Sequence, residues 1–320
     1  MLSAVGYSQN ADTYLNEKNI RTILETIASP DMEGRETGQP GQKKAAEYIR
    51  GVFDHAGLKP VMGDSYFQHY PLQTTGRGQK KAHRKLKAEN VIGLLEGAAN
   101  KNQFIVISAH YDHLGKRDSL IYCGADDDGS GTTSVIALAQ YFGEKAKRGV
   151  LPDVSLLFVL FSGEEKGLLG SSYFVKNPPV NIDSIVCDIN IDMVGRTDSV
   201  HSTDSMYIYS IGSAMINPAL AELVGKADSQ CCNLHLDYKY DAPDEPNRFY
   251  YRSDHYNFAK KGIPVVFFFS GIHKDYHQPG DTADKIQYQL LQARLHLFSE
   301  VVTEACRRNS LLLTGPQRIK

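Results

Sequence analysis

The sequence lacks tryptophan, Cys-x-x-Cys pairs and any apolar run long enough to cross a membrane. Without such a run a membrane-spanning helix is excluded, because one needs about 20 apolar residues in succession. The cysteines number five, and an odd count without Cys-x-x-Cys spacing argues against a disulfide framework or a cysteine-bound zinc. They are Cys123, Cys187, Cys231, Cys232 and Cys306, of which the first two lie beside apolar runs and are typical of small core residues.

The chain also lacks a strong net charge. Its formal charge is −2 and its isoelectric point is about 6.6, so the charge favours neither nucleic acid nor an anionic membrane as a partner. One basic run, residues 76–87, contains glycine but no aromatic residue, which indicates a solvated loop. Hydrophobic residues make up 42% of the 320 residues, which is enough for a large core.

The first residues, MLSAVGYSQNA, are small and mildly apolar, with no basic residue among them. Two interpretations fit: an ordinary chain start, or the trailing end of a signal peptide. The second predicts a periplasmic or extracellular protein, and the alternative is a cytoplasmic one. For the organisation of the chain we expect a flexible segment over 1–16, one domain over 17–310 and a tail over 311–320.

Apolar runs alternate with segments of helical periodicity along most of the chain. Several runs are continuously apolar, which is typical of strands buried on both faces. The pattern predicts an α/β fold: a three-layer sandwich with a mostly parallel or mixed central sheet and helices on both faces. Strands are predicted over 90–95, 104–109, 155–161, 184–191, 206–211 and 265–270, and helices over 17–28, 42–56, 131–147, 168–175, 218–227, 255–261 and 287–307.

Imidazoles and carboxylates follow several of these strands directly. In a sheet of this kind, functional groups collect at the carboxyl ends of the strands, so we expect these side chains to meet at one edge. Imidazole and carboxylate ligands without thiolates suit zinc, and less strongly cobalt or manganese. The residues concerned are His110, Asp112, Glu164, Glu165, Asp192 and His277, together with the run Asp126, Asp127 and Asp128 ahead of a predicted helix.

Taken singly, each of these patterns has an ordinary explanation. His-x-Asp after a strand is most often a surface loop, the aspartate run is a good helix N-cap, and GEEKG is a typical solvated turn. Their common edge favours a site. Adjacent residues at a strand end point in opposite directions, so one glutamate of the pair can bind metal while its neighbour acts as general base. Asp112 is spaced to accept the imidazole N–H of His110.

Together these motifs resemble the di-zinc aminopeptidase family, which also includes glutamate carboxypeptidases and glutaminyl cyclases. The resemblance covers about residues 20–307 and implies the zinc-dependent exopeptidase fold. No segment is long enough for the protease-associated domain that many relatives insert. The motifs that carry the resemblance are DMEGRETGQPG, SAHYDHLG, GADDDGSGT, FSGEEKGLLGS, NIDMVGR, SDHYNFAKKGIP and YHQPGDTADKI.

The resemblance implies a role for each matched position. It implies two zinc ions per chain, with cobalt or manganese as substitutes, and a cis peptide bond between Asp127 and Asp128. The implied roles are His110 and Asp192 on one zinc, Asp127 as the bridge, Glu165 and His277 on the other zinc, Glu164 as general base, Asp112 orienting His110, and Tyr276 polarising the substrate carbonyl.

The function expected is a zinc-dependent aminopeptidase, in which a metal-bridging hydroxide attacks the N-terminal peptide bond and Glu164 is the general base. A glutaminyl cyclase is disfavoured because such relatives rely on tryptophan around the pocket. An inactive binding protein is disfavoured because the ligands and the base are all present. A carboxypeptidase needs a cation for the substrate carboxylate, which Arg248 or Arg252 can supply, although both are typical of solvated loop charges.

The expected partner is a peptide with a free N-terminus. Carboxylates dominate the predicted edge, and their negative charge favours an ammonium group over a carboxylate. Asp254 is a candidate contact for that ammonium group. Phe249, Tyr250 and Tyr251 are candidates for an apolar pocket around the first side chain, and core packing is the alternative for all three. The oligomeric state does not follow from the sequence.

Overall fold

The computed structural model describes residues 12–72, 86–242 and 244–313. The predicted signal-peptide remnant and nearly all of the basic run therefore lie outside the described residues. Asp12–Leu15 form a short 3-10 helix with Leu15 buried, so regular structure starts before the predicted boundary at residue 17. A last helix, Asn309–Leu313, likewise extends beyond the boundary predicted at 310 and buries Leu312.

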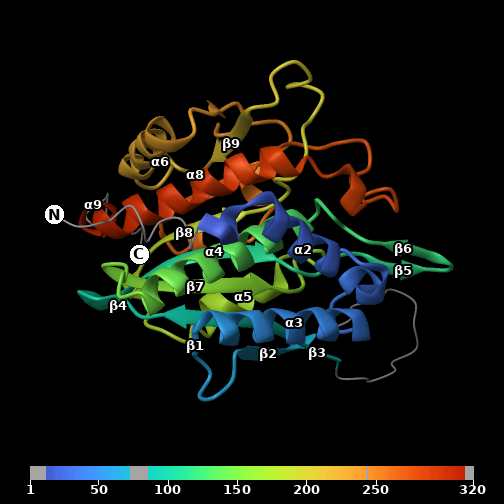
Figure 1. Cartoon of the computed structure of the whole chain (residues 1–320), viewed down its shortest axis with the longest axis horizontal. Coiled ribbons are helices and arrows are strands. Elements are labelled where there is room, and N and C mark those ends of the chain that lie inside the picture. The colour runs from blue at the N-terminus through green and yellow to red at the C-terminus, as the bar shows by residue number, and fades with distance from the viewer. Residues whose placement is uncertain (1–11, 73–85, 243, 314–320) are drawn as a thin grey trace.

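The described residues form a nine-stranded mixed sheet covered by helices on both faces (Figure 1). The strands are β1 (Lys59–Pro60), β2 (Phe67–Leu72), β3 (Leu86–Leu95), β4 (Asn100–His110), β5 (Gly115–Arg117), β6 (Leu120–Tyr122), β7 (Val154–Phe161), β8 (Ile185–Ile191), β9 (Tyr207–Ile211), β10 (His235–Asp237) and β11 (Val265–Phe269). The α-helices are α2 (Glu17–Ile27), α3 (Pro40–Ala56), α4 (Gly129–Lys147), α5 (Leu169–Lys176), α6 (Pro218–Cys231), α7 (His255–Ala259), α8 (Tyr288–Arg307) and α9 (Asn309–Leu313). The 3-10 helices are η1 (Asp12–Leu15), η2 (Pro30–Arg35), η3 (Ile182–Ser184), η4 (Phe249–Tyr251) and η5 (Ala283–Lys285).

The predicted α/β class and the predicted strands and helices are confirmed, with their ends shifted by a few residues. The sequence analysis missed β1, β2, β10 and the hairpin of β5 and β6. β1 has only two residues, and β2 alternates buried and exposed side chains around Pro71. Short strands of this kind contain no apolar run long enough to produce a signal.

The directions of the central strands determine where functional side chains can gather. The strand order is β1-β3-β7-β4-β8-β11-β9-β10, with β2 paired to β3. β4 is parallel to both β7 and β8, and β8 is parallel to β11, so four adjacent strands run in the same direction. Their carboxyl ends therefore lie at one edge, as the sequence analysis predicted.

Alternate residues of the central strands belong to different layers of the core. Ile105 and Ile107 of β4 pack into the larger cluster, which also contains buried side chains of α2, α3, α4 and α8. Phe104 and Val106 pack instead into the cluster on the other face, with Phe174 of α5 and Phe258 of α7. Burial on both faces explains why these strands are continuously apolar.

Helix α4 begins directly beneath the carboxyl edge. Asp128 is its N-cap and accepts a hydrogen bond from the backbone N–H of Gly131 at 2.8 Å, as well as one from Met193 N–H at 3.1 Å. Gly131 lies so close to β8 that a Cβ there would be 2.1 Å from the Ile191 carbonyl oxygen. The expected cis peptide bond between Asp127 and Asp128 is present.

The sequence also led to expectations about disulfides and membrane-spanning helices. Cys123, Cys187 and Cys306 are buried and free, but Cys231 and Cys232 form a disulfide at the end of α6, which the odd cysteine count did not indicate. None of the helices in the described residues has the length and apolar character needed to cross a membrane.

Candidate metal centre and active site

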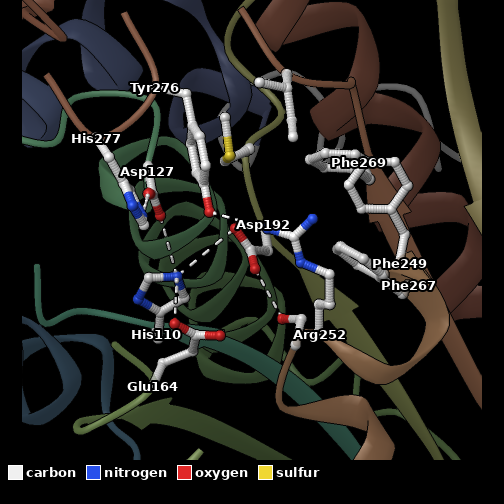
Figure 2. Close-up of a pocket in the computed structure, with 13 residues that line it drawn as sticks. His110, Asp127, Glu164, Asp192, Phe249, Arg252, Phe267, Phe269, Tyr276 and His277 are labelled. Carbon is white, nitrogen blue, oxygen red and sulfur yellow. Dashed lines mark hydrogen bonds and ion pairs between the residues drawn. The ribbon is translucent and has the colours of Figure 1, made fainter. Parts of the chain in front are cut away.

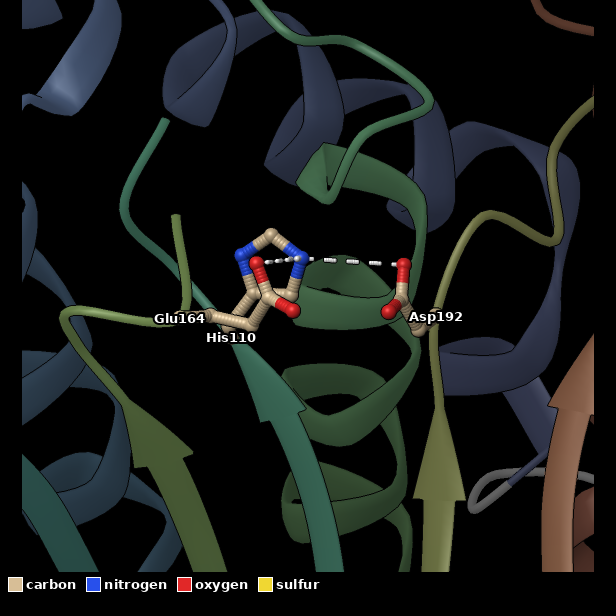
Figure 3. Close-up of side chains that lie close together, drawn as sticks. All are labelled: His110, Glu164 and Asp192. Atoms are coloured by element: carbon tan, nitrogen blue, oxygen red, sulfur yellow. Dashed lines mark ion pairs between the residues drawn. The ribbon is translucent and has the colours of Figure 1, made fainter. Parts of the chain in front are cut away.

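The predicted ligands converge at the carboxyl edge, beginning with His110 at the last position of β4 (Figures 2 and 3). Its Nε2 lies 3.4 Å from Asp127 Oδ1 and 3.6 Å from Asp192 Oδ1. His110 is buried, and Asp192 follows β8, the strand beside β4. Two neighbouring parallel strands and the turn before α4 thus bring one imidazole and two carboxylates together.

A second group of ligands shares Asp127. His277 Nε2 lies 3.0 Å from Asp127 Oδ2 and 3.3 Å from Glu165 Oε2. Asp127 therefore presents one oxygen to each histidine, the arrangement expected of a carboxylate that bridges two ions. Burial raises the pKa of Asp127, but the contacts with His110 and His277 dominate and hold that pKa well below its ordinary value. The carboxylate is ionised and suited to a cation.

The donor set fits divalent zinc. Nitrogen and oxygen ligands without thiolates are typical of catalytic zinc sites. Asp127 Oδ2 is buried and, apart from its contacts with the histidines, has no hydrogen-bond partner among the described residues, and a bound cation would remove that cost. Among the described residues, two groups of side chains are close enough to hold an ion, namely His110 with Glu164 and Asp192, and His113 with Asp127 and Glu165.

Glu164 occupies the position expected of a general base. It follows β7, and its Oε2 lies 4.0 Å from His110 Nε2 (Figure 3). Burial, together with the carboxylates of Asp192 and Asp254, raises the pKa of Glu164 well above its ordinary value, against the opposing effect of His110. A raised pKa makes a carboxylate a stronger proton acceptor. Its neighbour Glu165 points to the other group of ligands, as the sequence analysis expected of adjacent residues.

The structure gives Asp112 a wider role than the one implied by the resemblance. Its carboxylate lies 3.8 Å from His110 Nδ1, whereas its backbone carbonyl oxygen is closer, at 3.1 Å from the same nitrogen. The carboxylate oxygens accept hydrogen bonds from the Thr37 hydroxyl at 2.6 Å and from the Glu164 backbone N–H at 3.2 Å. Asp112 thus connects the segment before α3 to the loop that carries Glu164.

Ser253 is one of the site residues that the sequence analysis missed. Its hydroxyl donates a hydrogen bond to Asp192 Oδ2 at 2.7 Å and accepts one from the Asn190 side-chain amide at 2.9 Å. This leaves Asp192 Oδ1 to face His110. Partners of this kind fix the orientation of a metal ligand. The sequence holds a weak signal, because Ser253 directly precedes Asp254 in the SDHYNF motif.

A pocket opens beside the metal centre (Figure 2). Tyr276 lies between the metal centre and the pocket. Its ring stacks on that of His277 with centroids 3.9 Å apart, and its hydroxyl lies 3.4 Å from Arg252 Nη2. Burial raises the pKa of the Tyr276 hydroxyl, which therefore stays protonated and able to donate. The remaining wall is largely apolar and consists of Met193, Phe249, Phe267, Phe269 and Ile272.

Of the predicted substrate contacts, only Phe249 lines this pocket. Phe249, Tyr250 and Tyr251 form η4, and such a tight turn sends consecutive side chains in different directions, so that Tyr250 packs on His255. Asp254 is 0% exposed in this structure. Tyr250, Tyr251 and Asp254 are not among the residues that line the pocket. Arg252, treated as a solvated charge, lines it instead.

The carboxyl edge of the sheet also presents less negative charge to a substrate than the sequence predicts. Asp126 accepts a hydrogen bond from Gly195 N–H at 2.6 Å, and Asp128 caps α4. Both side chains are fully buried, so neither faces a substrate.

The fold and the site define an α/β protein with a group of imidazoles and carboxylates, suited to a metal ion, at the carboxyl edge of its sheet. The structure superposes on an aminopeptidase from Aneurinibacillus sp. strain AM-1 with a TM-score of 0.70 at 18% identity, covering 91% of this chain and 94% of that one. It matches a Zn-dependent exopeptidase from Parabacteroides distasonis ATCC 8503 with a TM-score of 0.66 at 19% identity, covering 90% and 98% of the two chains. These matches concern the fold.

The chain belongs to Peptidase family M28, whose model matches residues 90–302. It is 28% identical over 261 residues to Aminopeptidase YwaD of Bacillus subtilis (strain 168), covering 76% of this chain and 51% of that protein. It is 25% identical over 271 residues to Leupeptin-inactivating enzyme 1 of Streptomyces exfoliatus, covering 84% and 52%. The chain spans about half the length of these curated relatives. The resemblance noted from the motifs is confirmed.

Proposed function

We propose that this chain is a zinc-dependent aminopeptidase that hydrolyses the first peptide bond of substrates with a free α-amino group. The observation that carries the proposal is the placement of Asp127 between two histidines, with Glu164 beside the same cluster. Relatives named as aminopeptidases, in sequence and in structure, support it.

The contacts within the two ligand groups support a division of the residues between two zinc ions. His110 and Asp192 would hold one ion, Glu165 and His277 the other, and Asp127 would be shared. Zinc bound there would lower the pKa of a water molecule and polarise the substrate carbonyl, and cobalt or manganese could substitute for it.

The residues of the chain supply the proton transfers and the orientation. Glu164 would accept a proton from the attacking water and return it to the leaving amine, and its raised pKa suits both steps. Tyr276 lines the same pocket and keeps its proton, so its hydroxyl can donate a hydrogen bond to the carbonyl oxygen of the scissile bond. Ser253 and Asp112 would hold Asp192 and the loop of Glu164 in place.

The pocket supports an apolar first side chain. Phe249, Phe267 and Phe269 form one wall, and their rings lie in contact with centroids 5.0 to 5.3 Å apart. Apolar walls with a few polar groups at one end are typical of small-molecule and side-chain pockets. The polar end here is the ligand cluster, part of which lines the same pocket.

A carboxypeptidase is the second candidate, and one observation favours it. Arg252 lines the pocket, is exposed, and forms no ion pair with any of the described residues. A guanidinium group in that position can bind a substrate carboxylate. The carboxylate would belong either to the C-terminus of a peptide or to an acidic side chain.

A substrate panel separates these candidates. Leucyl-p-nitroanilide, its N-acetylated form and a pentapeptide should be incubated with zinc-loaded protein, and the peptide products identified by mass spectrometry. An aminopeptidase releases residues from the N-terminus and leaves the acetylated substrate intact. Equal rates on the free and acetylated substrates would refute the proposal, and loss of the C-terminal residue alone would establish the carboxypeptidase.

A further inference from the structure

His113 belongs to one of the two groups of side chains close enough to hold an ion, but the proposed function gives it no role. It comes three residues after His110 and is 1% exposed. Its ring is held tightly, because a Cβ added at Gly124 would lie 2.5 Å from its Cγ and Cδ2 atoms. Its backbone N–H donates to the Arg35 carbonyl oxygen at 3.3 Å. Both ring and backbone are therefore fixed before any ion binds.

The ring of His113 makes one short polar contact. Its Nδ1 lies 2.9 Å from Glu165 Oε1, whereas Asp127 Oδ2 is 3.8 Å away. The other oxygen of Glu165, Oε2, lies 3.3 Å from His277 Nε2. Two histidines thus contact the two different oxygens of one carboxylate.

The separations between side-chain atoms indicate which of them would hold an ion. With zinc–ligand bonds of about 2.0–2.2 Å, ligand atoms in a tetrahedral site lie about 3.3–3.6 Å apart. His277 Nε2, Glu165 Oε2 and Asp127 Oδ2 have separations near or just below this range, at 3.3 and 3.0 Å from the shared nitrogen. Neither Glu165 Oε1 nor His113 Nδ1 has a hydrogen-bond partner elsewhere among the described residues, so the 2.9 Å contact between them is the short polar contact open to both atoms.

We infer that His113 is a positioning residue that holds Glu165 by Oε1 and so directs Oε2 to the metal. The inference rests on the proposed function, because it concerns the same zinc centre. A carboxylate held in this way loses less rotational freedom when it binds an ion, so the site binds zinc more tightly. Removal of such a supporting partner typically lowers metal affinity about 10–100-fold.

A matched pair of variants tests this role. Asparagine and leucine have the same branching, but only His113→Asn keeps an N–H donor close to the place of Nδ1. Zinc affinity should be measured by competition with a chromophoric chelator, and zinc content by elemental analysis. We expect H113L to weaken one of the two ions about 10–100-fold and to spare the other. H113N should stay within a few-fold of the wild type, and the metal-free melting temperatures will show whether both variants fold.

The double variant H113L/E165Q provides the control for direct action. If His113 acts through Glu165, the leucine substitution should have almost no further effect on zinc affinity once Glu165 is replaced. Equal losses in H113N and H113L would overturn the inference and make His113 a direct ligand. Unchanged affinity in both would also overturn it while leaving the proposed function intact. A wild-type protein that binds no zinc would refute both.

Discussion

Replacement of Arg35 by methionine should destabilise the protein and loosen the metal centre together. Arg35 is 0% exposed and has no ion-pair partner among the described residues. Its guanidinium group instead donates four hydrogen bonds to backbone carbonyl oxygens at 2.7 to 2.8 Å. The acceptors are Ile27, Tyr111, Cys123 and Gly124, so one side chain joins the end of α2 to the segments that follow β4 and precede α4.

The size of the effect follows from these bonds. Hydrogen bonds from a charged donor contribute about 1.5–3 kcal/mol each, so four would give about 6–12 kcal/mol. Two effects reduce this sum: the Gly124 carbonyl keeps a second donor, Gly129 N–H, and the variant no longer buries a charge. We expect a net loss of about 3–5 kcal/mol, a large part of the roughly 5–15 kcal/mol that stabilises a typical protein.

Urea unfolding and thermal unfolding of the zinc-free protein measure this loss. Arg50→Met is the matched control, because Arg50 is an exposed arginine of α3 whose ion pair with Glu47 should contribute less than about 1 kcal/mol. Zinc affinity should fall in R35M but not in R50M, since Tyr111 adjoins His110 and Gly124 precedes the aspartate run. A loss below about 1 kcal/mol in R35M would refute the reasoning that these four bonds secure the metal-bearing segments.

Three further predictions concern the site. Glu164→Gln should keep zinc but lower turnover by about 10²–10⁴-fold, whereas Glu165→Gln should weaken zinc binding. Elemental analysis and leucyl-anilide assays on both variants check this, and exchanged phenotypes would reverse the roles proposed for the two glutamates. Wild-type protein should bind two zinc ions per chain, and a strong chelator should abolish activity until zinc is restored; a single tightly bound ion after zinc supplementation would contradict the bridging role of Asp127. Ser253→Ala should lower zinc affinity about 10–100-fold, because it removes the 2.7 Å hydrogen bond to Asp192, while Ser184→Ala in the half-buried helix η3 should not change it.

The sequence by itself determined the class of fold and the position of the ligands along it. Continuous apolar runs are typical of strands buried on both faces, and parallel strands must place their carboxyl ends at a common edge. His110, Glu164 and Asp192 follow such strands directly, so their convergence was predictable without knowledge of the packing. The opposite directions of Glu164 and Glu165 follow from the same local geometry.

Only the tertiary structure decided which other side chains reach that edge. The pairs concerned are Thr37 with Asp112, Ser253 with Asp192, and His113 with Glu165. The spacing of these residues along the chain does not predict their contacts. Asp254 is buried and Arg252 lines the pocket although the two lie two positions apart, because the direction of a side chain in a tight turn depends on what packs against the turn. Periodicity fixes the direction of side chains on strands and long helices, whereas in loops long-range packing fixes it.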